Sequence, residues 1–286
     1  MGPSKRAKIW RRTRVGGTIA GVVGLLLWAS AQPNGAPLVL AVGSLLAFGG
    51  ILETVRMGAL DARVGLAGSF AGLLAVVFVL ARLPDMGLME ALLGASGCAG
   101  AGALLAALGR GPKAGRPNLG LPAGLVFLVS LGLPGLFAVR MAYGPAGLVA
   151  LLVLAKAGDI AGYYVGNAIG KSHPFPRISP GKTTAGCVGS LIAGTLCGLA
   201  FQLGGAFPEA RLGIASGLCA GALINVTAQA GDLFESWVKR RVGIKDSGTW
   251  FGPSGGVLDL VDSFLFAVPV TWITWPWLFA RLTDLG

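Results

Sequence analysis

The chain changes character at residues 230–263, which read AGDLFESWVKRRVGIKDSGTWFGPSGGVLDLVDS. This stretch carries five of the twelve acidic residues of an otherwise apolar sequence, and they alternate with basic side chains. The charged residues are Asp232, Glu235, Lys239, Arg240, Arg241, Lys245, Asp246, Asp259 and Asp262. Carboxylates supply the hard oxygen ligands that Mg²⁺ prefers, whereas basic side chains and glycine N–H groups bind phosphate oxygens. The composition therefore indicates a site where a metal ion and phosphate groups meet.

The spacing of these residues predicts two helix ends that face a common site. If residues 211–240 form one helix, four polar residues at positions i, i+3, i+4 and i+7 share a face. They are Asp232, Glu235, Ser236 and Lys239. Asp259 and Asp262 repeat the i, i+3 spacing at the start of the next apolar run, and the glycines and proline of residues 247–256 predict a loop between the helices. The alternative is a solvated connector between two membrane helices.

The rest of the chain predicts an all-α polytopic membrane protein. Hydrophobic residues make up 54% of its 286 residues and charged residues only 12%, which is too apolar for a soluble globule. About nine runs are long enough to cross roughly 30 Å of hydrocarbon as helices. They lie at residues 15–31, 36–52, 64–83, 88–109, 121–139, 145–166, 184–204, 211–231 and 257–280. We expect residues 1–144 to form scaffold helices and residues 145–286 to form the catalytic region, with cytoplasmic loops at 167–183 and 232–256.

The positive charge is placed as in a membrane protein. The formal net charge is +11, and six basic residues precede the first apolar run. Of the Lys and Arg residues, 18 fall in alternate loops that include the N-terminus, against 4 in the opposite loops. This bias predicts a cytoplasmic N-terminus and contact with anionic lipid headgroups rather than with nucleic acid. Trp272, Trp275 and Trp277 are expected to form an aromatic belt at the outer interface.

Two further polar segments lie before this stretch. Lys156 and Asp159 stand at i, i+3 inside an apolar run, either as a structural ion pair or with Asp159 facing a catalytic cavity. Residues 170–186, GKSHPFPRISPGKTTAG, contain three prolines that exclude a helix. Thr183 and Thr184 are expected to cap the helix that follows.

These segments resemble the phosphatidate cytidylyltransferase (CDP-diacylglycerol synthase) family. Its C-terminal signature is matched in register at Ser236, Val238, Lys239, Arg240, Lys245, Asp246, Gly248, Gly255, Gly256, Asp259 and Asp262. An upstream family motif is matched at Ser179, Pro180, Lys182, Thr183 and Gly186. Two signature positions depart from the family, which has His at Ser254 and Arg at Leu260. By that resemblance, the missing positive charge is expected from Lys239, Arg240 or Arg241.

The resemblance implies transfer of a cytidylyl group from CTP to phosphatidate in phospholipid biosynthesis, giving CDP-diacylglycerol and pyrophosphate, with Mg²⁺ as cofactor. It implies metal ligation by Asp232 and Asp259. Catalytic roles fall to Asp246, Lys245 and Asp262, and substrate binding to Ser179, Lys182, Thr183, Ser236, Lys239, Arg240, Gly255 and Gly256. The expected location is a bacterial-type inner (plasma) membrane with the active site facing the cytoplasm. A homodimer is left open.

Three alternatives to this activity follow from the same residues. One is an ion-coupled transporter that uses the intramembrane charges as a relay. Another is a degenerate, non-catalytic lipid-binding relative, suggested by the departures from the family motifs at Ser254, Leu260, Gly181 and Ala185. The third is a related enzyme that acts on another lipid phosphate or polyprenol.

The topology is testable by cysteine labelling of intact cells. A Thr249→Cys variant should react with a membrane-impermeant thiol reagent only after the cytoplasmic side is exposed, because the charge bias places residues 232–256 there. Labelling from the outside alone would reverse the predicted orientation.

Overall fold

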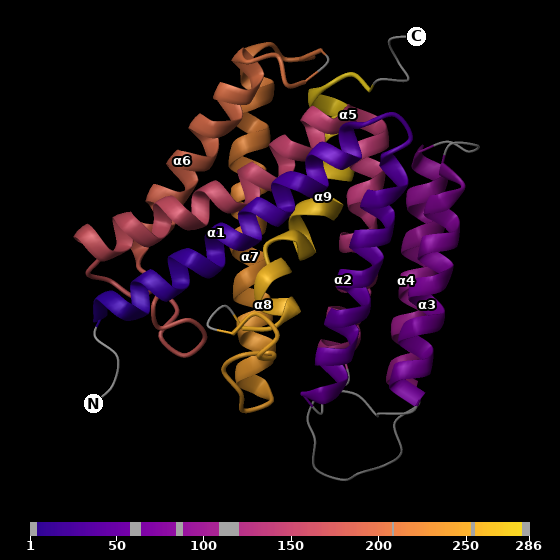
Figure 1. Ribbon diagram of the computed structural model, residues 1–286, viewed down its shortest axis with the longest axis horizontal. Helices are drawn as coiled ribbons and strands as arrows, with labels where there is room; N and C mark the ends of the chain where they lie inside the picture. The colour runs from indigo at the N-terminus through magenta and orange to yellow at the C-terminus, as the bar shows by residue number, and fades with distance from the viewer. Residues whose placement is uncertain are drawn as a thin grey trace.

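The computed structural model describes residues 5–57, 64–83, 88–108, 120–207, 209–252 and 255–281, and these segments are mostly helical (Figure 1). Within them, β-structure is limited to one isolated bridge between Ala210 and Phe279. The helices are α1 (Lys5–Ala31), α2 (Ala36–Arg56), α3 (Val64–Ala81), α4 (Leu88–Leu108), α5 (Gly120–Ile169), α6 (Thr184–Leu203), α7 (Ile214–Arg241), α8 (Val257–Val261) and α9 (Phe264–Leu278). The expected all-α class is confirmed.

Several helices are long and apolar enough to cross a membrane. In the described part of the chain, five segments meet this condition: Ala36–Arg56, Gly124–Ile169, Thr184–Leu203, Ile214–Arg241 and Val257–Leu278. Shorter apolar helices occur at Gly16–Ala31, Leu66–Ala81 and Glu90–Leu105. Large apolar side chains such as Leu45 and Leu74 point outward, 71% and 69% exposed, as expected for a surface in contact with lipid. The count of nine spans and the cytoplasmic N-terminus stay predictions.

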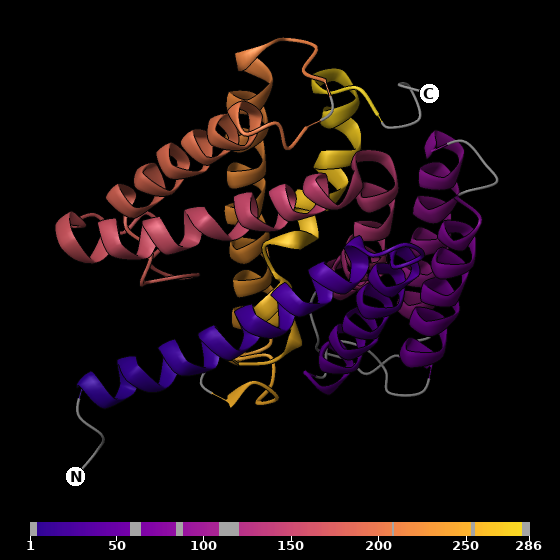
Figure 2. The same ribbon diagram turned by 45° about the horizontal axis from the view of Figure 1, so that its top comes forward.

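The long helix α5 bends sharply at Gly144. This glycine has φ 73° and ψ −175°, a backbone conformation that residues with a Cβ rarely adopt, and Pro145 follows it. The bend divides α5 into two arms. Figure 2 shows the second arm crossing the molecule beside α6.

Small residues let the second arm of α5, α6 and α7 pack closely. A Cβ added to Gly162 would lie 3.0 Å from the carbonyl oxygen of Gly186, and one on Gly221 would collide with the carbonyl oxygen of Gly194. Backbones approach this closely because lipid tails supply no hydrophobic drive for helix association, and van der Waals contact replaces it. Gly162 therefore lies at the contact between α5 and α6.

Helix α9 lies inside the bundle, and this corrects the expected aromatic belt. Trp275 is fully buried, Trp272 is 7% exposed, and only Trp277 of the three points outward, at 75% exposure. Trp275 packs edge-on against Tyr143 and Phe207. The sequence pattern fails here because a tryptophan that packs in the core and one that faces the interface look alike in a short aromatic run.

The loop before α6 and the loop after α7 are both polar, and they lie at the same end of the bundle. Helix α7 begins beside the end of α9, where the backbone N–H of Arg211 donates to the carbonyl oxygen of Leu278. At its other end, Arg240 Nε donates to the carbonyl oxygen of Ile178 at 3.3 Å. The loop after α7 therefore meets the loop before α6, and both lie opposite the α6–α7 connection (Figure 1).

The packing of α6 on α7 predicts a clear effect for one substitution. Gly221→Ala should lower stability by about 1–3 kcal/mol because the new methyl group meets the α6 backbone. Thermal unfolding in detergent measures this change. Gly97→Ala is the matched control, since an added Cβ there meets nothing within 4 Å. Equal melting temperatures for the two variants would contradict the described packing.

Candidate active site

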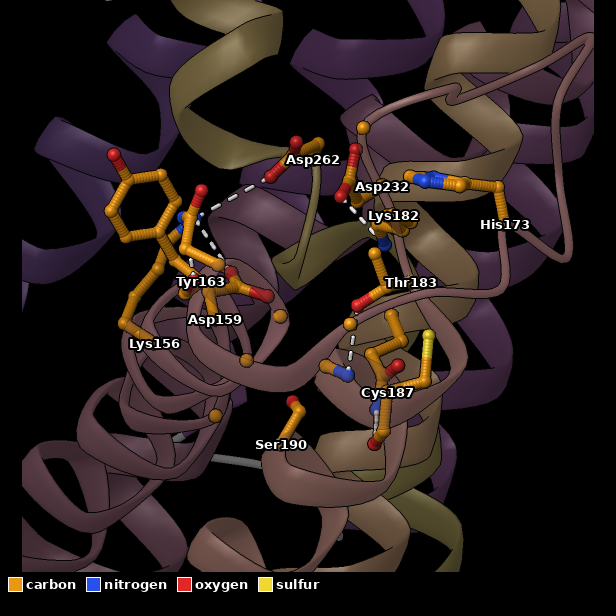
Figure 3. Close-up of a pocket in the computed structure, with 18 of the residues that line it drawn as sticks. Lys156, Asp159, Tyr163, His173, Lys182, Thr183, Cys187, Ser190, Asp232 and Asp262 are labelled. Atoms are coloured by element: carbon orange, nitrogen blue, oxygen red, sulfur yellow. Dashed lines mark hydrogen bonds and ion pairs between the residues drawn. The ribbon is translucent and has the colours of Figure 1, made fainter.

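A cavity of about 750 Å³ lies where the two polar loops meet the second arm of α5 (Figure 3). Its wall combines glycines from α5, the loop before α6 and α6 with polar and charged side chains from these elements and from α7, α8 and the α8–α9 junction. The charged lining residues are Lys156, Asp159, Lys182, Asp232, Asp259 and Asp262. Residues from the upstream family motif and from the C-terminal signature therefore line the same cavity.

One side of the cavity is built around the Lys182–Asp232 ion pair. Lys182 Nζ lies 2.7 Å from a carboxylate oxygen of Asp232, which joins the loop before α6 to α7. Thr183 is the N-cap of α6, and its Oγ1 accepts a hydrogen bond from the backbone N–H of Gly186 at 3.1 Å. Ser236 Oγ donates a long hydrogen bond of 3.4 Å to Asp232. The expected cap at Thr183 is confirmed.

The opposite side of the cavity contains a second charged cluster. Lys156 Nζ donates to Ser263 Oγ at 2.9 Å and lies 3.4 Å from Asp262 Oδ1. Asp159 is more distant from Lys156, at 4.0 Å, and accepts a hydrogen bond from Ser263 Oγ. Figure 3 shows Lys156, Asp159 and Asp262 directed toward one another. The closer partner of Lys156 is thus Asp262 rather than its neighbour on the helix.

Asp259 is held in place by four donors. One carboxylate oxygen pairs with Lys239 Nζ, and the other accepts bonds from Ser247 N, Ser247 Oγ and Gly256 N at 2.9, 2.7 and 2.8 Å. Gly255 has φ 86°, and a Cβ there would collide with the Asp259 carboxylate. The two glycines of the signature therefore shape the turn that orients Asp259.

Glu53 of α2 is a site residue that the sequence analysis missed. Its carboxylate accepts hydrogen bonds from Val257 N and Leu258 N at 2.8 and 2.9 Å. Ser247 Oγ lies 2.8 Å away and has one proton, which Glu53 shares with Asp259. Glu53 is 1% exposed. Ser247 Oγ lies between the carboxylates of Glu53 and Asp259, so α2 contacts the network that fixes Asp259. A lone carboxylate at the end of an apolar run was the available signal.

Other expected site residues lie away from the cavity. Lys239 is buried between Glu235, at 2.6 Å, and Asp259. Lys245 and Asp246 are exposed. Five more of the expected substrate-binding residues do not line the cavity: Ser179, Ser236, Arg240, Gly255 and Gly256. Leu260 is half-buried, and Ser254 lies outside the described residues.

The donor chemistry of the cavity fits a hard divalent cation. In the described segments, no three His, Cys, Asp or Glu side chains are already gathered as a ligand set. The cavity nevertheless has four aspartates facing two lysines, and Asp159, Asp232 and Asp262 lie close enough to repel one another. Carboxylate oxygens in this excess suit Mg²⁺, which takes one or two protein carboxylates and completes its shell with water and phosphate.

The chain is similar in sequence to a known protein family and to several curated proteins. Residues 10–277 match the cytidylyltransferase family. The phosphatidate cytidylyltransferase of Helicobacter pylori strain J99 is 36% identical over 136 residues, covering 48% of this chain and 49% of that protein. Those of Aquifex aeolicus (37% over 115 residues, 40% and 41% covered) and Bacillus subtilis (35% over 127 residues, 44% and 46% covered) are similar. The chain matches about half the length of these curated relatives.

The role of Glu53 can be tested by an isosteric change. Glu53→Gln keeps the shape but turns an amide toward backbone N–H groups, so a buried donor loses its acceptor and stability should fall by about 1–3 kcal/mol. Thermal unfolding in detergent, together with protease cleavage near Thr249, measures the loss. Glu90→Gln, at an exposed carboxylate of α4, is the control. Equal stability and equal cleavage in the two variants would refute the role of Glu53.

Proposed function

The chain belongs to the cytidylyltransferase family, and from that premise we propose that it transfers the cytidylyl group of CTP to phosphatidate, giving CDP-diacylglycerol and pyrophosphate. The observation that carries the proposal is the Lys182–Asp232 ion pair. It joins the two segments that match the family motifs at one side of a cavity, whose volume of about 750 Å³ lies within the usual range for small-molecule sites.

The proposed reaction is a single displacement at phosphorus. A phosphate oxygen of phosphatidate attacks the α-phosphorus of CTP and forms the new P–O bond. The bond from that phosphorus to the oxygen that bridges to the β-phosphate breaks, and pyrophosphate leaves with the electron pair. Because the attacking group is already an anion, the protein has to position the two substrates and neutralise their charge rather than activate a nucleophile.

Lys182 and Thr183 are proposed to bind the phosphates of CTP. Lys182 lines the cavity, and its ammonium can exchange the contact with Asp232 for a phosphate oxygen. The Thr183 hydroxyl lies beside it at the N-terminus of α6, where backbone N–H groups and the helix dipole favour an anion. Lys239 is proposed to act through Asp259, since its ammonium is buried in that contact. Lys245 and Asp246 are exposed and do not line the cavity, so neither is assigned a contact with CTP.

We propose Mg²⁺ as the cofactor, held by Asp232 and Asp259 with Asp262 nearby. The ion would neutralise negative charge on the phosphate groups when bound. The excess of aspartates over lysines in the cavity supports this assignment, because a triphosphate would otherwise be repelled. Asp259 is oriented by Ser247, Gly256 and Lys239 before any ligand arrives, which keeps one carboxylate in a fixed position.

The proposal places the site at the cytoplasmic face of a bacterial inner membrane. CTP is available in the cytoplasm, and the loop that carries Lys182 contacts the last turn of α7 through the bond from Arg240 Nε to the carbonyl oxygen of Ile178. The lipid substrate stays in the bilayer, so its phosphate has to reach the cavity from the side. Outward-facing apolar residues on the second arm of α5, such as Ile160 at 60% exposure, are compatible with that route.

The proposed function predicts the behaviour of an Asp232→Asn variant. The change keeps the shape of the side chain but removes a charge that faces the cavity, so the rate of pyrophosphate release should fall at least ~10²-fold. The assay uses purified protein with CTP, phosphatidate and Mg²⁺. Glu209→Gln is the control, because this exposed carboxylate lies at the opposite end of the bundle. Near-normal turnover of Asp232→Asn at limiting Mg²⁺ would contradict the assignment.

A further inference from the structure

We propose that Lys156 and Ser263 form a separate phosphate subsite, which receives the phosphate group of the lipid acceptor. This inference rests on the proposed function and assigns the two substrates to different sides of the cavity. The nucleotide phosphates would lie at Lys182 and Thr183, and the lipid phosphate at Lys156. The chemical class of the ligand is a phosphate monoester attached to a diacylglycerol body.

Lys156 is the cavity cation with the weakest attachment to its carboxylates. Its ion-pair distances to Asp262 and Asp159 are 3.4 and 4.0 Å, whereas Lys182 lies 2.7 Å from Asp232. Only the bond to Ser263 Oγ, at 2.9 Å, has a length typical of a strong hydrogen bond. An ammonium has three donors. Lys156 can therefore keep Ser263 and direct its other donors to an incoming phosphate.

Three basic side chains at the end of α7 are already engaged. Lys239 is 7% exposed and lies between Glu235 and Asp259. Arg240 donates to two backbone carbonyl groups, and the guanidinium of Arg241 lies 5.3 Å from the centre of the Trp237 ring. None of the three lines the cavity. The positive charge that the family carries at the position of Leu260 is therefore better supplied here by Lys156, beside Asp262.

The surroundings of Lys156 suit a lipid headgroup rather than a nucleotide. Its side chain is 36% exposed, and its ammonium lies 5.3 Å from the centre of the Phe264 ring. One turn away on the same arm of α5, Ile160 is 60% exposed, and Val153, three residues before Lys156, is 38% exposed. Residues three or four apart on a helix are surface neighbours. A charged contact for the phosphate thus lies next to an outward-facing apolar surface that acyl chains can follow.

The experiment compares binding of two probes to the purified full-length protein in detergent. Dihexanoyl phosphatidate reports on the lipid subsite, and CTP with Mg²⁺ reports on the nucleotide subsite, each by calorimetric titration. Lys156→Gln should weaken phosphatidate binding at least about tenfold, the usual scale for losing a hydrogen bond to a charged group. Its affinity for CTP should stay within about threefold. Lys182→Gln should give the reverse pattern.

Two further variants separate binding from folding. Lys156→Gln combined with Asp159→Asn removes one charge of each sign, so it should also lose phosphatidate binding while keeping the cluster balanced. Lys156→Arg should retain binding, because a guanidinium also binds phosphate. The subsite is overturned if the protein does not bind dihexanoyl phosphatidate, if Lys156→Gln leaves its affinity unchanged, or if that variant weakens CTP instead. Lys156-dependent lipid binding without cytidylyl transfer would support the subsite and reject the proposed function.

Discussion

The arrangement of the site depends on one buried interaction, the contact of Glu53 with the start of α8. A carboxylate without water is stable only if hydrogen bonds replace its hydration. Val257 N and Leu258 N supply two of them, and Ser247 Oγ shares its one proton between Glu53 and Asp259. Ser247 also bonds to the carboxylate of Asp259, and Asp259 forms an ion pair with Lys239. A helix from the first part of the chain thereby orients a carboxylate at the cavity some two hundred residues later.

Local features of the site could be predicted from the sequence. Helix α7 runs as one element from Ile214 to Arg241, so Asp232 and Ser236 share a face as the spacing indicates. Thr183 caps α6, and Gly162 lies against the α6 backbone. These features depend on residues three to four positions apart, on a cap or on the absence of a Cβ. Each has a local physical cause that the sequence carries directly.

Contacts between distant segments could not be predicted in the same way. The residues around Glu53 in the sequence do not indicate that it contacts Ser247 or Val257. The hydropathy pattern indicates only that Glu53 lies at the end of an apolar span. Lys156 pairs more closely with Asp262 than with Asp159, because the crossing of α5 and α9 decides the distance. The burial of Trp275 likewise follows from the central place of α9 in the bundle. Helix packing sets all three, and a single sequence does not encode it in any short pattern.

We propose that CTP meets the lipid phosphate in the cavity between Lys182 and Asp262. The most direct measurement is an experimental structure of the protein with a non-hydrolysable CTP analogue and Mg²⁺ in a lipid environment. We expect nucleotide phosphates beside Lys182 and Thr183, with the ion on Asp232 and the facing aspartates. Nucleotide density outside this cavity, or phosphates bound through Lys245 and Arg241 at the surface with the cavity left to lipid alone, would contradict it.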